Sequence, residues 1–105
     1  MNLTAEQLRT MPLPVAAVDA PEYGDDAQVY VRTFPGTDVE QIDALGTGGT
    51  FLSRLAALAL CDAEGVRLFS NDDLEAVGRL PVALLRRVAD AALTLNRLDQ
   101  GSAKN

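Results

Sequence analysis

The pattern of hydrophobic and polar positions divides the chain into short strands near its start and helices further on. Two runs rich in Val, Ala and aromatic residues, over residues 13–18 and 28–34, predict β-strands. The segment between them is polar and contains Pro, Gly and two adjacent Asp residues, so we expect an antiparallel hairpin with a long tip. A short helix is expected ahead of this hairpin, because Thr4 can act as its N-cap with Gln7 at the capping-box position.

From the end of the second strand onward, apolar residues follow the helical period. Thr37 can cap a short helix that Gly46 ends, with Glu40 at the capping-box position. The glycine-rich stretch 46–50 then predicts a flexible connection, and Thr50 can cap the helix that follows it. That next helix is apolar on nearly every side as far as the cysteine, which is typical of a helix at the centre of a fold.

The last helix is expected to begin near Pro81 and to run to about Leu98. Its apolar residues form two neighbouring stripes, which together cover an arc of about 220° at about 100° per residue. This arc is wider than packing on one neighbour needs, so either two elements flank the helix or one stripe is left for a partner. The first stripe consists of Leu84, Val88, Ala91, Leu95 and Leu98, and the second of Val82, Leu85, Ala89 and Leu93.

Between the central and last helices, residue types mark each boundary. Asp62 and Gly65 delimit a tight turn, because Asp bonds the backbone that follows it and Gly tolerates positive φ. Ser70 can cap a following acidic helix, with the Asp73 carboxylate reaching back to it. Gly78 offers a left-handed end to that helix.

These elements predict an α+β fold, in which an N-terminal antiparallel β-hairpin packs on a bundle of about four helices and the C-terminal half is mainly helical. A length of 105 residues suits one domain, which we place at residues 1–100, with residues 101–105 as a disordered tail. Apolar residues make up 48% of the chain and charged residues 23%, as in ordinary globular proteins.

Charge and cysteine content limit the partners. Nine basic and fifteen acidic residues give a net charge of −6, so nucleic acid is not expected as a partner. No apolar run approaches membrane-spanning length and no segment is typical of a secretory leader, so we expect a cytoplasmic protein without a membrane partner. Cys61 is the only cysteine, which excludes an internal disulfide and fits a reducing compartment.

The residue types also argue against catalysis and metal binding. The chain has no His, which removes His-dependent triads and the commonest metal ligand. An EF-hand register with Gly65 at its sixth position places Leu60 and Asn71 where carboxylates are essential. The glycines at 46–50 lack the Lys of a P-loop. We therefore expect no enzyme, no catalytic or metal site and no cofactor.

The second stripe of the last helix is the candidate protein-binding site. Core packing also accounts for its residues, but an exposed apolar stripe would be an interaction surface. A Leu93→Asp substitution separates the two alternatives. On a partner-binding surface it should leave the monomer folded and abolish binding, whereas unfolding would assign Leu93 to the core. The candidate residues are Val82, Leu85, Ala89 and Leu93.

Several motifs together resemble one protein family. A leucine-rich helix is followed from Cys61 by the pattern C-D-x-x-G-x-R-L-F-S-x-x-D-x-x-x-x-G and then by an amphipathic helix that ends in L-N-x-L. This order resembles the tail assembly chaperones of long-tailed bacteriophages. The run V-D-A-P-E-Y-G at 18–24, followed by V-Y-V-R at 29–32, is similar to the N-terminal hairpin of that family, in which V-P-E-W-G is common and Tyr23 here replaces Trp.

The resemblance implies a function. Members of this family bind the tape measure protein, a very long, helical and apolar chain, and keep it soluble until the tail tube protein polymerises around it. They are not enzymes and are generally absent from the finished virion. The resemblance also implies self-association and contact with the tail tube protein. Residues alone leave two other classes open, namely a small structural virion component of the tail or head–tail region, and a bacterial adaptor or antitoxin-like module.

Many members of the family also exist as a longer product made by ribosomal frameshifting. The residues Ala103, Lys104 and Asn105 could be encoded by GCA AAA AAC, which contains a slippery run. A messenger RNA without that run and without an overlapping downstream frame would remove this hypothesis.

Overall fold

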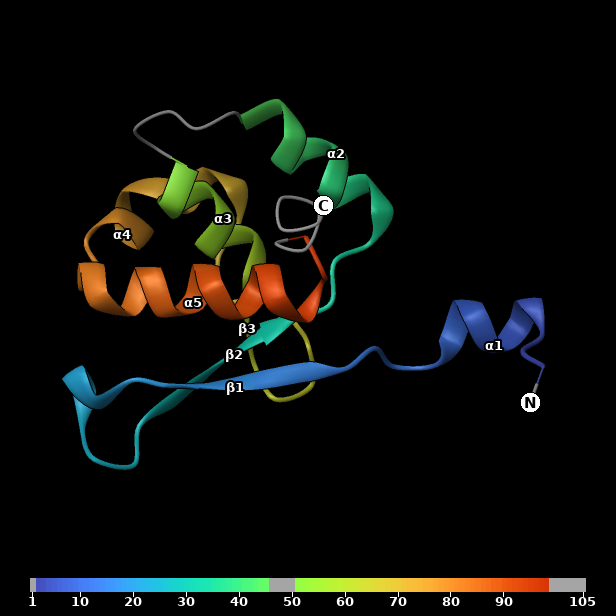
Figure 1. Cartoon of the computed structure of the whole chain (residues 1–105), viewed down its shortest axis with the longest axis horizontal. Coiled ribbons are helices and arrows are strands. Elements are labelled where there is room, and N and C mark those ends of the chain that lie inside the picture. Colours follow the sequence, from blue (N-terminus) through green and yellow to red (C-terminus); the bar gives the residue numbers. More distant parts are fainter. Residues whose placement is uncertain (1, 46–50, 99–105) are drawn as a thin grey trace.

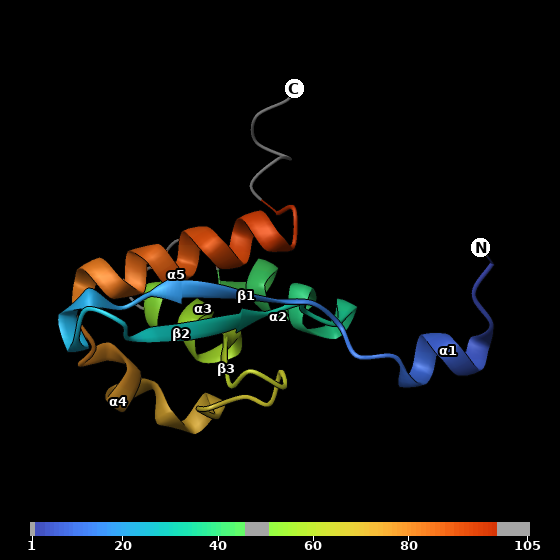
Figure 2. The same ribbon diagram turned by 90° about the horizontal axis from the view of Figure 1, so that it is seen from below.

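The structure, a computed structural model, describes residues 2–45 and 51–98. In that part, three antiparallel strands form a sheet in the order β1-β2-β3, and helices cover one of its faces (Figures 1 and 2). The expected α+β class, with an N-terminal hairpin and a mainly helical C-terminal half, is confirmed. The elements are α1 (Ala5–Thr10), β1 (Val15–Asp19), η1 (Pro21–Tyr23), β2 (Gln28–Arg32), α2 (Gly36–Leu45), α3 (Phe51–Ala59), β3 (Leu60–Cys61), η2 (Asn71–Asp73), α4 (Leu74–Gly78) and α5 (Val82–Leu95), where η1 and η2 are short 3₁₀ helices.

Strands β1 and β2 form the expected hairpin. The register places Val18 opposite Val29 and Ala16 opposite Val31. Val18 and Val31 are buried beneath the helices, whereas Ala17, on the opposite face, is exposed. The alternation therefore fixes which face of the hairpin the helices cover.

The central helix ends two residues earlier than expected. It stops at Ala59, and the next two residues form β3, with Leu60 opposite Val31 and Cys61 opposite Tyr30. The apolar pattern concealed this strand, because Leu60 and Cys61 continue the run of the helix before them. No residue separates α3 from β3, so the helix is joined directly to the sheet.

Helix α3 is the centre of the fold, as expected. Its last five residues, 55–59, are all buried. The helix packs against α2, α4, α5 and β2, so apolar side chains are needed on nearly every side. Gly78 of α4 faces Ser53 of α3, and a Cβ there would lie 3.4 Å from the Ser53 hydroxyl, which is van der Waals contact. The expected left-handed stop at Gly78 is wrong: among the described residues, the glycines with positive φ are Gly24 and Gly65.

The start of α2 differs from the prediction. The helix begins at Gly36, and the carbonyl of Pro35 accepts the backbone N–H of Asp38 at 3.0 Å. Thr37 therefore lies inside the first turn, and its prediction as N-cap is wrong. The expected stop at residue 46, the connection 46–50, its Thr50 cap and the tail 101–105 lie outside the described residues.

Two predicted capping boxes are confirmed. In the first, the Thr4 hydroxyl accepts the Gln7 backbone N–H at 3.1 Å, and the Gln7 side chain accepts the Thr4 backbone N–H at 2.9 Å. In the second, the Asp73 carboxylate accepts the Ser70 backbone N–H at 2.8 Å. Each box satisfies backbone donors that a helix start otherwise leaves unpaired.

Helix α1 lies away from the rest of the molecule (Figures 1 and 2). It buries none of its residues. A membrane-spanning helix, which must be long and continuously apolar, does not occur in the described residues.

Candidate partner-binding surface

Helix α5 has neighbours on two sides. It packs against α3 and against both β1 and β2 (Figure 2). Of the two alternatives that its wide apolar arc left open, the structure therefore has two flanking elements. Both predicted stripes contribute buried residues, namely Leu84 and Val88 from the first and Leu85 and Ala89 from the second. Ala92, which belongs to neither stripe, is also buried.

The candidate stripe is divided between core and surface. Leu85 and Ala89 are each only 5% exposed, so for these two the core-packing alternative holds and they do not belong to an exposed surface. Leu93 is half-buried and packs against the core, while Val82 is 58% exposed. Val82 and Leu93 lie only about 20° apart around the helix axis and about 16 Å apart along it. The surface part of the stripe is thus one edge of the buried arc of α5.

A second group of exposed apolar side chains lies in the N-terminal arm, which we define as residues 2–14. Leu8, on α1, is 69% exposed. The sequence pattern did not identify this arm as an exposed apolar surface. The signal available was a pair of prolines, Pro12 and Pro14, which separate the capped helix from the first strand. The exposed large apolar residues of the arm are Leu3, Leu8, Met11 and Leu13.

The turn after β3 adds to this region. The Asp62 carboxylate accepts the backbone N–H groups of Glu64 and Val66, each at 2.9 Å, and Gly65 has a φ of +87°, as the sequence predicted for this turn. Val66 and Leu68, which leave the turn, are more than half exposed. Beside it lies a hollow of about 200 Å³, which we call the arm hollow; it is lined by Pro12, Leu13, Val15, Arg32, Thr33, Pro35, Glu64 and Gly65.

Two arginines hold the C-terminal end of α3. Arg67 donates to the Ala57 carbonyl at 2.8 Å, and Arg32 donates to the Leu58 carbonyl at 2.6 Å. These carbonyls belong to the last turn of a helix, where acceptors lack helical partners and cations are favoured. Burial lowers the pKa of Arg67, and the neighbouring Arg32 lowers it further. No local sequence pattern indicates this role, because it is the turn and the strands that bring both side chains to the helix end.

Arg32 is itself neutralised. Its guanidinium contacts the Asp38 carboxylate at 2.5 Å, and both side chains are largely buried. The same group lies 5.5 Å from the centre of the Phe34 ring. The ion pair with Asp38 joins the end of β2 to the start of α2. Arg32 is therefore engaged within the fold and is not available as a cation for a ligand.

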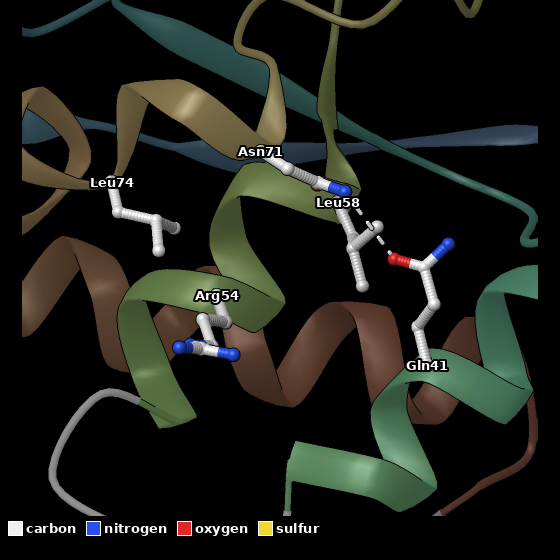
Figure 3. A pocket seen from close by; sticks show the side chains of 5 residues that line it. All are labelled: Gln41, Arg54, Leu58, Asn71 and Leu74. Atoms are coloured by element: carbon white, nitrogen blue, oxygen red, sulfur yellow. Dashed lines mark hydrogen bonds between the residues drawn. The ribbon is translucent and has the colours of Figure 1, made fainter.

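A small pocket lies between α2, α3 and the start of α4 (Figure 3). Its volume is about 180 Å³, below the roughly 300–1,000 Å³ typical of small-molecule sites. Leu58 and Leu74 supply apolar walls, and the Asn71 side-chain amide donates to Gln41 at 3.4 Å. Arg54 is exposed beside them. The pocket can accommodate one apolar side chain of a partner.

The remaining reactive groups do not converge. Cys61 is buried, and this burial raises the pKa of its thiol, which makes it a poor nucleophile. In residues 2–45 and 51–98, no group of three or more His, Cys, Asp and Glu side chains is placed to hold a metal ion.

Comparisons of the chain with protein-family models, curated proteins and solved structures find no significant match.

Proposed function

We propose that this chain is a tail assembly chaperone of a long-tailed phage or prophage. It acts in the host cytoplasm by binding the tape measure protein and keeping that protein soluble while the tail tube forms. The observation that carries the proposal is the role of the motif residues in the fold. Gly65 adopts a positive φ, Arg67 binds the end of α3, and Ser70 caps η2. The motif behind the resemblance is thus a set of residues that build one local structure.

Two apolar residues on α5, the exposed Val82 and the half-buried Leu93, supply the means of binding. Val82 and Leu93 share an edge of α5, onto which a helical partner can lay its own apolar side chains. Leu85 and Ala89 lie beneath this edge and support it from the core. The net charge of −6 gives each bound copy a repelling surface, which favours solubility of a partner covered by many copies.

Co-expression tests this function. The tape measure protein should be the very long helical chain encoded in the neighbouring reading frame. We expect it to be insoluble when expressed alone, and to be soluble and co-purified when this chain is present. Without such a gene nearby, or without a change in its solubility, the proposal fails.

Substitutions on α5 locate the contact. Val82→Asp and Leu93→Asp should each abolish co-purification, since both place a charge on the apolar edge. Ala83→Asp is the matched control, because Ala83 is also exposed but lies about 100° further round the helix. If Leu93→Asp unfolds the monomer, Val82→Asp still tests the contact, because Val82 is exposed. Equal binding by Val82→Asp and the control would remove α5 as the contact.

Purified particles distinguish the chaperone from a structural virion component. A chaperone should be absent from finished tails, whereas a tail or head–tail protein would be detected in them by mass spectrometry at a fixed ratio to the tube protein.

A further inference from the structure

The N-terminal arm has a stable local design but no packing partner within its own chain. Thr4 and Gln7 close a complete capping box at the start of α1. However, helices shorter than about 12–15 residues are marginal in water, and α1 buries none of its six residues. Leu8 lies on α1 and Met11 is the C-cap directly after its last residue, so the two exposed side chains lie within about one helical turn of each other. The arm is thus built like a docking element whose receiving surface lies elsewhere.

The chain between α1 and β1 directs the arm outward. Pro12 and Pro14 each fix their own φ, and each disfavours a helical conformation of the residue before it. Met11 has φ −70° and ψ 136°, an extended conformation. Residues 11–14 therefore act as a stiff extended spacer. Folding α1 back onto its own arm hollow would require a sharp reversal inside this spacer.

Most of the prominently exposed apolar residues lie in two places, the arm and the turn beside the arm hollow. Among the described residues, eight large hydrophobic side chains are prominently exposed, and six of them belong either to the arm or to the turn beside the arm hollow. Val66 follows Gly65, which lines the hollow, and Gly65 lies against Val15 at the arm root. The six residues are Leu3, Leu8, Met11, Leu13, Val66 and Leu68.

We propose that two copies of this chain exchange their N-terminal arms, so that α1 of each molecule packs on the arm hollow and the exposed Val66 and Leu68 of the other. The arm and its receiving surface are present on every copy, so a two-fold axis closes the contact with both arms used. This inference does not depend on the proposed chaperone function.

Interface area favours a second copy as the occupant. Stable interfaces bury roughly 1,200–2,000 Å² of surface in total, and one short arm on its own is small for burying that area. Exchange places two arms and two hollows in one interface and so doubles the buried area. The charged residues of the arm are Glu6 and Arg9, which form an ion pair 3.2 Å long. The arm itself therefore carries no net charge, so its contact with the second copy adds no repulsion to that between the two acidic bodies.

Sedimentation velocity of the full chain tests the dimer. We expect the unmodified protein, of 11.2 kDa, to sediment at twice that mass over a wide range of concentrations. Leu8→Asp and Val66→Asp should each weaken the dimer by at least about ten- to hundred-fold, since each removes an apolar contact and buries a charge. Tyr23→Asp is the matched control: Tyr23 is 60% exposed but lies at the far tip of the hairpin, and this variant should remain dimeric.

Mixing the variants separates exchange from other dimers. A Leu8→Asp chain keeps an intact hollow and a Val66→Asp chain keeps an intact arm. Their mixture should therefore form a heterodimer with one undamaged contact, weaker than the unmodified dimer but stronger than the dimer of either variant alone. Likewise, mixing a Leu8→Cys chain with a Val66→Cys chain should give a disulfide-linked dimer under oxidation. A monomeric unmodified protein, or a dimer that Leu8→Asp leaves intact, would overturn the proposal.

Discussion

Asn96 binds the backbone of Phe34 across sixty-two positions of sequence. Its side-chain oxygen accepts the Phe34 N–H at 2.7 Å, and its side-chain nitrogen donates to the Arg32 carbonyl at 3.2 Å. The same nitrogen also donates to the Ala92 carbonyl at 2.9 Å. One amide thus pairs backbone groups at the end of β2 and just beyond it, and it fastens the end of α5 to the sheet.

Replacement of Asn96 should be costly. In Asn96→Ala, the backbone groups of Phe34 and Arg32 lose their partner in a part-buried position, and we expect stability to fall by about 2–3 kcal/mol. Urea unfolding followed by circular dichroism measures the loss. Asp90→Ala, an exposed change on the same helix, should shift stability by less than about 0.5 kcal/mol. Similar values for both variants would show that the amide contributes little.

Arg67 should matter more than an arginine on the surface. Arg67→Met keeps much of the side-chain length but leaves the Ala57 carbonyl without its guanidinium donor, so we expect a loss of about 1–3 kcal/mol. Arg79→Met is the control, because the Arg79–Glu75 pair is largely exposed and should contribute at most about 0.5 kcal/mol. Thermal unfolding of both variants gives the comparison. Equal melting temperatures would contradict a stabilising role at the end of α3.

The end of α5 offers a route to higher stability. Arg97 has a φ of 60°, and the Leu98 N–H donates to the Leu93 carbonyl at 2.8 Å, which together form a Schellman motif. Glycine suits that backbone conformation better, so Arg97→Gly should raise stability by up to about 1 kcal/mol. Arg97→Ala keeps the strain and should bring no such gain. If both variants gain equally in chemical denaturation, loss of the arginine charge and not relief of strain is the cause.

Glu22 should make stability sensitive to acid. A hydrogen bond from its own backbone N–H lowers its pKa below the ordinary 4.5; desolvation opposes this effect, and Arg87 lowers the pKa again through a hydrogen bond and its charge. Because the folded pKa is the lower one, this contribution is present above the ordinary value and is lost as pH falls through the folded value. Stability measured from about pH 5 to about pH 3 should therefore fall less steeply in Glu22→Gln than in the unmodified chain. Identical pH profiles would contradict the prediction.

Local features were predictable from the sequence because their signals lie within a few residues. The caps at Thr4 and Ser70, the turn at Asp62 and the two hairpin strands all depend on neighbours close along the chain. Helix α3 was also placed correctly at the centre, since its apolar residues surround its axis.

Features that depend on distant contacts were not predictable in the same way. Strand β3 exists because β2 pairs with it, and no local signal separates Leu60 from the helix before it. Leu85 and Ala89 are buried because a sheet and a helix both cover α5, whereas the period of the sequence shows only that the helix has a wide apolar arc. The exposure of Leu8 likewise becomes visible only once the position of α1 is known.

Helix α3 passes directly into β3, with no linker residue between Ala59 and Leu60. A rotation of the helix by one residue would turn both strand residues to the wrong side and break their bonds to β2. Helix α3 and strand β3 must therefore move together as one rigid unit. A residue inserted at this junction would be tolerated far less than one added at the hairpin tip. Any change in length among natural relatives should accordingly collect at the tip and spare the junction.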